Sequence, residues 1–177
     1  DYSNSAVSCL NPLRIEDLSP RIARNRSIMT DPPLRIALLG AGIFATTCHA
    51  PVIQSNPAVF SCIAVWSRSP ESADTLAATL GGADAYSGEH GLQQVLQLPY
   101  LDAVIMALPL DVQPKYVVMV LEAGKNILSE KPIAATVSKA KELQQLYSRK
   151  YSSSGGMQWS IAENFRYEPA ILRTAEA

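Results

Sequence analysis

Small residues occupy the place where an expected strand turns into a helix. Gly40, Gly42 and Ala45 follow an apolar run in the spacing G-x-G-x-x-A. In this pattern the first glycine allows a tight turn, the second lets the backbone approach a pyrophosphate, and the alanine allows close helix packing. Backbone amides that open the helix, at Ile43 and Phe44, could hold the anion at the positive end of the helix. The motif predicts a dinucleotide site, and glycines that serve only the turn are the alternative.

Residues after the second expected strand bear on the choice of dinucleotide. In an open parallel sheet the ligand lies beyond the carboxyl ends of the strands, and an acid after this strand would accept from a ribose 2′-hydroxyl. The chain instead carries Ser67 and Arg68 there. A guanidinium with neighbouring hydroxyls can bind a 2′-phosphate. We therefore predict NADP as the cofactor, with NAD also allowed; a solvated loop arginine is the alternative.

Two later strand ends add further candidates. Leu108 and Pro109 are expected to contact the cofactor through their backbone, unless Pro109 only ends its strand. Glu130, Lys131 and Pro132 follow the next strand. An ammonium near a reacting hydroxyl or carbonyl oxygen stabilises developing charge and can exchange a proton. Lys131 is thus the candidate catalytic residue, whereas a Glu-Lys-Pro surface turn is the alternative.

Three segments together resemble the Gfo/Idh/MocA family of nicotinamide-dependent oxidoreductases: GAGIFA, LEAGKNILSEKPIA and AENFRYEPA. The resemblance covers residues 34–177. It implies that Lys131 lies beside the nicotinamide and substrate, that Glu130 contacts the nicotinamide ribose, and that Pro132 follows a cis peptide bond. Arg166 matches an arginine near the family's active-site cleft, where it could bind a polar substrate or support the lysine loop; helix capping or an interdomain ion pair is an equal alternative.

The chain also departs from the family pattern. Gln113 stands where the family often has a histidine, and Asn126 replaces the histidine of AGKH. Family members continue into an antiparallel α/β domain, which supplies a catalytic histidine and normally carries the oligomer interface. We therefore expect only the beginning of that domain here, with homo-oligomers in a full-length form.

From residue 34 onward, apolar strands alternate with helical segments, which predicts parallel strands joined by crossovers. The expected fold class is α/β, a Rossmann-type doubly wound parallel sheet, with the second α/β substrate domain missing or only begun. The expected strands are 35–39, 60–66, 85–86, 101–108, 126–129 and 157–162, and the expected later helices are 90–98, 116–122 and 136–151.

The domain prediction divides the chain into three parts. Residues 1–33 form a leader that is expected to be disordered. Its arginines and serines suggest organelle targeting as the alternative, although targeting segments carry few acids. Residues 34–162 form the dinucleotide-binding domain, and residues 163–177 begin the truncated substrate domain.

Composition limits the function classes. The chain has 177 residues, is 47% hydrophobic and carries a formal net charge of −1. This near neutrality argues against a nucleic-acid surface, and the sequence contains no apolar run approaching the roughly 20 residues of a membrane span. Cys9, Cys48 and Cys62 lack metal-ligand spacing. We expect a cytoplasmic protein that has a small-molecule substrate and no metal.

Two functions follow from these observations. The first is an NADP(H)-dependent oxidoreductase that transfers hydride between nicotinamide and a sugar, polyol or related carbonyl substrate. The alternative is a non-catalytic dinucleotide-binding or interaction module.

Overall fold

The computed structural model describes residues 32–152, 156–168 and 173. Contacts divide the chain into two compact units, Asp1–Asp102 and Ala103–Ala177. The leader prediction therefore lies almost entirely outside the described residues. In the described part of the chain, no helix is long and apolar enough to cross a membrane.

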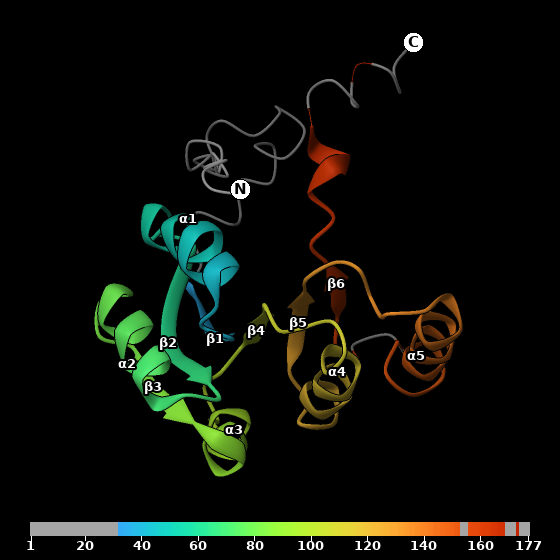
Figure 1. Cartoon of the computed structure of the whole chain (residues 1–177), viewed down its shortest axis with the longest axis horizontal. Helices are drawn as coiled ribbons and strands as arrows, with labels where there is room; N and C mark the ends of the chain where they lie inside the picture. The colour runs from blue at the N-terminus through green and yellow to red at the C-terminus, as the bar shows by residue number, and fades with distance from the viewer. Residues whose placement is uncertain (1–31, 153–155, 169–172, 174–177) are drawn as a thin grey trace, which may run out of the picture. The chain divides into compact units, whose positions relative to one another are not determined.

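The first unit is a parallel three-stranded arrangement in the order β3-β2-β1 (Figure 1). The strands are β1 at Leu34–Leu39, β2 at Phe60–Ser67 and β3 at Asp84–Ser87. The inner strand residues Leu38, Leu39 and Val65 are fully buried, as expected for strands covered on both faces. All three strands confirm the prediction, and each extends it by one or two residues.

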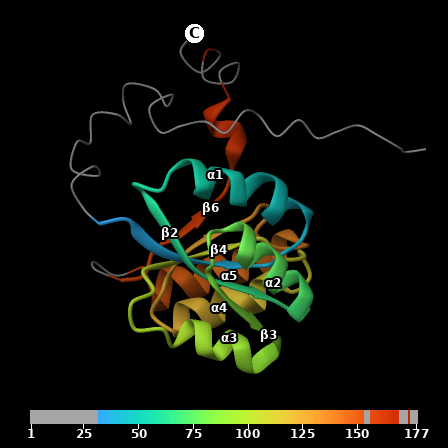
Figure 2. The same ribbon diagram turned by 90° about the vertical axis from the view of Figure 1, so that its left-hand side faces the viewer.

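The helices of the first unit are α1 at Ala50–Ser55, α2 at Pro70–Thr79 and α3 at Gly88–Leu96. Helix α2 begins where the sequence places its signals, because Ser69 caps the helix and Pro70 occupies its first turn. Figure 2 shows α1 and α3 on opposite sides of the unit.

A π-helical segment, η3 at Ala45–His49, precedes α1 and was not predicted. It leads directly into Pro51, which has no N–H to donate and whose ring would crowd the carbonyl four residues earlier. The hydroxyls of Thr46 and Thr47 also donate to the carbonyl of Ile43, over 2.9 and 2.7 Å. The wider π-helical turn accommodates both the proline and these side-chain hydrogen bonds. Hydrophobic periodicity does not indicate a π-helical turn.

The second unit pairs β4 at Ala103–Met106, β5 at Asn126–Ser129 and β6 at Trp159–Ile161 in parallel. Its helices are α4 at Gln113–Glu122, which packs on β5, and α5 at Val137–Lys150 (Figure 1). A 3₁₀ turn, η4 at Asn164–Tyr167, follows β6.

Side-chain hydrogen bonds fasten the edge strand β6. The Trp159 indole N–H donates to the buried Ser129 hydroxyl over 2.9 Å. The Tyr147 hydroxyl of α5 donates to the carbonyl of Met157 over 3.2 Å, and its ring meets Trp159 edge-on. The edge is therefore tied both to β5 and to α5.

The second unit confirms its predicted elements with some shifted limits. Strand β5 has the predicted bounds, but β4 and β6 are shorter than expected. Helix α4 begins three residues early because Pro114 fits its first turn, where the missing N–H has no helical partner to lose.

Candidate functional site

The glycine turn of the first unit has one buried and one open side. Gly40 is buried, its N–H donates to the carbonyl of Trp66 over 2.8 Å, and its φ of 108° lies in the region that favours glycine. Gly42 is exposed, and a Cβ added there would meet nothing within 4 Å. The turn is thus fixed to β2 on one side, while its second glycine faces open space.

The helical run that follows the turn exposes apolar residues. Ile43 is 83% exposed and Phe44 is 48% exposed, whereas Ala45 is buried against the unit as the fingerprint requires. The Phe44 ring meets the His49 imidazole edge-on at 5.4 Å between centroids, so His49 packs within this helical run. The first N–H groups of a helix have no partner within it, which leaves them suited to an anion.

The loop after β2 contains the residues expected at the adenosine ribose. Ser67 ends the strand half-buried, and Arg68 is exposed. The Ser69 hydroxyl accepts from the N–H of Ser72 over 3.3 Å and donates to Glu71 over 2.5 Å. This hydrogen bond lowers the pKa of the Glu71 carboxyl. Arg68 therefore supplies the loop's positive charge, while the Ser69 hydroxyl already serves the start of α2.

In the second unit, the loop after β5 carries Lys131. The N–H of Glu130 donates to the carbonyl of Met106 at the end of β4, over 3.0 Å. The N–H of Lys131 donates to the Glu130 carboxylate over 3.3 Å, and the Lys131–Pro132 peptide bond is cis, as the resemblance implies. This loop, the lysine loop, is hydrogen-bonded to the end of β4, and the Lys131 side chain is exposed.

Two contacts around this loop were not predicted from the sequence. The buried Gln113 side chain donates to the carbonyls of Glu130 and Pro132, over 2.8 and 2.9 Å. The Lys131 ammonium lies over the Phe165 ring, 4.9 Å from its centroid. The partners are far apart in sequence, and the only sequence signal at these positions is that Gln113 replaces a histidine common in the family.

The other predicted residues of this unit lie at the expected strand ends. Leu108 is half-buried and Pro109 is exposed, two and three residues beyond the end of β4. The carbonyl of Pro109 accepts from the N–H groups of Val112 and Gln113, so this turn leads into α4. Arg166 lies in η4, and its side chain is outside the described part of the structure.

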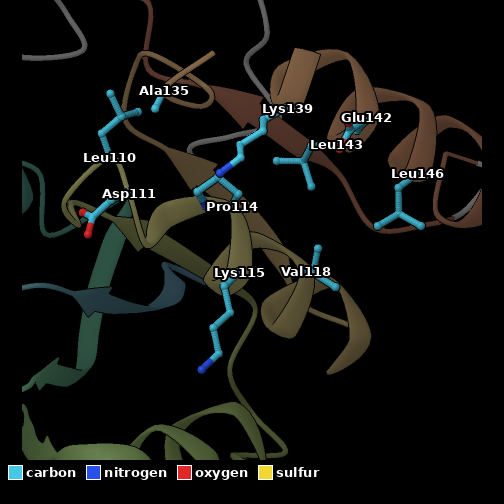
Figure 3. Close-up of a pocket in the computed structure, with 10 residues that line it drawn as sticks. All are labelled: Leu110, Asp111, Pro114, Lys115, Val118, Ala135, Lys139, Glu142, Leu143 and Leu146. Atoms are coloured by element: carbon cyan, nitrogen blue, oxygen red, sulfur yellow. The ribbon is translucent and has the colours of Figure 1, made fainter. Parts of the chain in front are cut away.

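A groove of about 460 Å³ lies between α4 and α5 in the second unit (Figure 3). Val118, Leu143 and Leu146 form apolar parts of its wall, and Lys115, Lys139 and Glu142 supply charged groups. None of the predicted site residues lines it. The groove is therefore separate from the lysine loop.

Burial makes the Cys62 thiol unreactive, and the described residues include no cluster that could hold a metal ion. Burial raises the pKa of the Cys62 thiol to about 11, so the unreactive thiol form dominates at neutral pH. Cys48 is half-buried. Among the described residues, no group of three or more histidine, cysteine, aspartate or glutamate side chains could hold a metal ion.

The family model described as "Oxidoreductase family, NAD-binding Rossmann fold" matches residues 34–152. The chain belongs to the Gfo/Idh/MocA oxidoreductase family. This membership confirms the resemblance, whose first two segments lie within the matched residues, and it confirms the Rossmann-type α/β fold class.

Individual oxidoreductases are similar in sequence to this chain. "Dehydrogenase FPY6" of Fusarium mangiferae is 41% identical over 147 residues, which is 80% of this chain and 41% of that protein. A dTDP-3,4-didehydro-2,6-dideoxy-alpha-D-glucose 3-reductase of Saccharopolyspora spinosa is 34% identical over 118 residues, or 67% of this chain and 34% of the reductase. The chain thus spans about 40% or less of the length of these relatives.

Solved structures share the fold. An oxidoreductase from Thermotoga maritima superposes with a TM-score of 0.73 at 28% identity, covering 81% of this chain and 42% of that one. A 3-ketoreductase from Actinomadura kijaniata, crystallised with NADP, gives a TM-score of 0.69 at 22% identity, covering 81% of this chain and 43% of that one. At such identity the second likeness concerns the fold alone.

Proposed function

We propose that residues 34–162 are the nucleotide-binding domain of an NADP(H)-dependent oxidoreductase that acts on a carbonyl or hydroxyl group of a sugar, polyol or related compound. The observation that carries the proposal is the open space over Gly42, in a turn whose other glycine is buried and bonded to β2. A pyrophosphate needs this close backbone approach. The residues present therefore fit a dinucleotide.

The remaining cofactor contacts follow the strand ends. The amides that open the helical run at Ile43 and Phe44 bind the pyrophosphate, and Ser67 and Arg68 bind the 2′-phosphate of the adenosine ribose. Leu108 and Pro109 provide backbone contacts. Glu130 binds the nicotinamide ribose, and Pro132 shapes the loop that holds it. The exposed guanidinium of Arg68 favours NADP over NAD.

Lys131 acts at the reacting oxygen. The bound nicotinamide supplies or accepts the hydride. In the reducing direction, the Lys131 ammonium donates a hydrogen bond to the substrate carbonyl oxygen and stabilises its developing negative charge. Its Nζ then gives a proton to that oxygen, which leaves an alcohol and a neutral amine, and solvent reprotonates the amine. Arg166 assists by binding a polar group of the substrate.

A sugar-like substrate is supported by the relatives. The Saccharopolyspora reductase, which is 34% identical, is named for reduction at position 3 of a dideoxy sugar nucleotide. Because the likeness covers 67% of this chain and only 34% of the reductase, the substrate is proposed only as a class.

The catalytic role is tested in a form of the protein that also carries the family's substrate domain. We expect Lys131→Met to lower kcat by about 100-fold or more, the size of a lost general acid, with NADPH affinity nearly unchanged. Lys141→Met, at an exposed lysine of α5, is the matched control. Unchanged turnover in Lys131→Met would contradict the role of Lys131. NADPH binding by a wild type that shows no turnover would favour a non-catalytic module.

A further inference from the structure

One buried polar side chain of the second unit has no part in the cofactor contacts proposed above. Gln113 is the first residue of α4 and only 2% exposed. Burying an amide costs free energy unless its hydrogen bonds are satisfied. A glutamine at this position therefore needs partners, and those partners indicate what it does.

The partners lie on both sides of Lys131. The Gln113 Nε2 donates to the carbonyl of Glu130 over 2.8 Å and to the carbonyl of Pro132 over 2.9 Å. A side-chain amide carries two N–H donors, and the Gln113 amide donates both to the residues on either side of the lysine. The backbone of Lys131 is thereby held from before and after.

The same glutamine is itself fixed. Its backbone N–H donates to the carbonyl of Pro109 over 3.0 Å, which ties the start of α4 to the turn after β4. The Glu130 N–H bonds to Met106 in β4 over 3.0 Å. The lysine loop is thus attached both to β4 and to the first residue of α4.

We propose that Gln113 is the positioning residue for Lys131: its two hydrogen bonds fix the loop so that the ammonium is presented in one place. This inference rests on the proposed function, because it assigns Gln113 a role through the catalytic lysine. A displacement of about 1 Å at a reacting group can lower the rate by up to about 100-fold. Holding the lysine loop in one position therefore has a direct effect on catalysis.

The chemistry of the two donors suggests the variants. Methionine matches glutamine in length but has no N–H, so Gln113→Met leaves both carbonyls without this donor. Histidine keeps a ring N–H that can serve one of them. Gln144, exposed in α5 of the same unit, offers the matched control Gln144→Met.

The first measurement needs no turnover and uses this chain. Exchange of the backbone amide hydrogens of Glu130, Lys131 and Ile133 is followed in the wild type, Gln113→Met and Gln144→Met; Pro132 carries no amide hydrogen. We expect exchange in this loop to be about tenfold faster in Gln113→Met and unchanged in Gln144→Met, because hydrogen bonds that oppose local opening are lost. Wild-type exchange rates in a folded Gln113→Met would overturn the proposal.

If circular dichroism shows that Gln113→Met does not fold, Gln113→His decides the matter. With one donor retained, its loop exchange should lie above that of the wild type while its far-UV spectrum is unchanged. Loop exchange identical to the wild type in a folded Gln113→His, combined with unchanged turnover, would overturn the proposal.

The second measurement is kinetic and uses a form that carries the substrate domain. Gln113→Met should lower kcat about tenfold or more, with the Kd for NADPH changed less than about twofold. The double variant with Lys131→Met should be no slower than Lys131→Met alone. An equal further loss in the double variant would overturn the positioning role. If Lys131→Met alone leaves turnover unchanged, the proposed catalytic role of Lys131 is wrong. The exchange experiment then still decides whether Gln113 holds the loop.

Discussion

The ammonium of Lys131 lies 4.9 Å from the centroid of the Phe165 ring. The ring belongs to η4, 34 positions along the chain, and it is 54% exposed. A cation over an exposed aromatic face gains about 0.5–1 kcal/mol. The η4 turn is in part fixed by Glu163, whose carboxylate accepts from the Phe165 N–H over 3.2 Å. The segment after β6 therefore helps to place the side chain that the loop after β5 presents.

Phe165→Leu removes the aromatic face and keeps an apolar side chain. We expect kcat to fall about three- to fivefold in a form that carries the substrate domain, which corresponds to the gain from an exposed cation–π contact. NADPH affinity should be unchanged. Phe165→Trp retains a ring and is the control that should keep near-normal turnover. A loss of NADPH affinity equal to the loss of turnover would show that Phe165 acts on the cofactor instead.

Arg68→Ala tests the choice of cofactor. Arg68 is exposed, so solvent screening of its proposed contact with a 2′-phosphate limits the expected loss of NADPH affinity to about tenfold. NADH, which lacks that phosphate, should bind with nearly the same Kd as before. Arg149→Ala in α5 removes an exposed arginine elsewhere and should change neither affinity. Calorimetric titration measures both ligands, and an equal loss for NADPH and NADH would contradict the assignment.

Ser69→Ala removes the cap of α2 and the hydroxyl beside Glu71. Loss of the cap should cost about 1 kcal/mol, or 2–4 °C in Tm for a chain of this size. The Glu71 contribution adds a pH dependence, because the hydrogen bond from the Ser69 hydroxyl is the main cause that lowers the pKa of the Glu71 carboxyl.

The sign of that dependence follows from linkage. A carboxyl with a lowered folded-state pKa stabilises the fold above its unfolded pKa, and this stabilisation is lost as the pH falls through the folded-state value. The Tm gap between wild type and Ser69→Ala should therefore be larger at neutral pH than in acid below both pKa values. In a Glu71→Gln background the gap should become independent of pH. A gap that widens on acidification would contradict this interpretation.

Much of the fold could be predicted because its signals are local. The bounds of β5 match the prediction because an apolar run follows the stop at Gly124, whose φ of 71° ends α4. Helix α2 likewise begins at local signals, because Ser69 caps the helix and Pro70 occupies its first turn. The π-helical segment was missed, since its cause is the competition between Pro51 and hydrogen bonding one turn earlier.

The candidate site was predictable only in part. Gly40, Gly42 and Lys131 could be found because a fingerprint spacing and a family motif mark them. Gln113 and Phe165 could not be assigned their contacts, because their partners lie 17 or more residues away and no periodic pattern joins them. Contacts of this kind arise from the packing of β4, β5 and η4 within the second unit.

The central claim is that a dinucleotide binds at the Gly40 to Ala45 turn, and Gly42→Ala tests it most directly. A Cβ at Gly42 meets no protein atom within 4 Å, so the variant should keep the wild-type Tm. It should, however, occupy the space that a pyrophosphate requires. Calorimetric titration with NADPH is predicted to show binding to the wild type and at least about tenfold weaker binding to Gly42→Ala, which corresponds to the loss of about 1.4 kcal/mol. Equal NADPH affinity for the two folded proteins, or no binding to the folded wild type, would contradict the account.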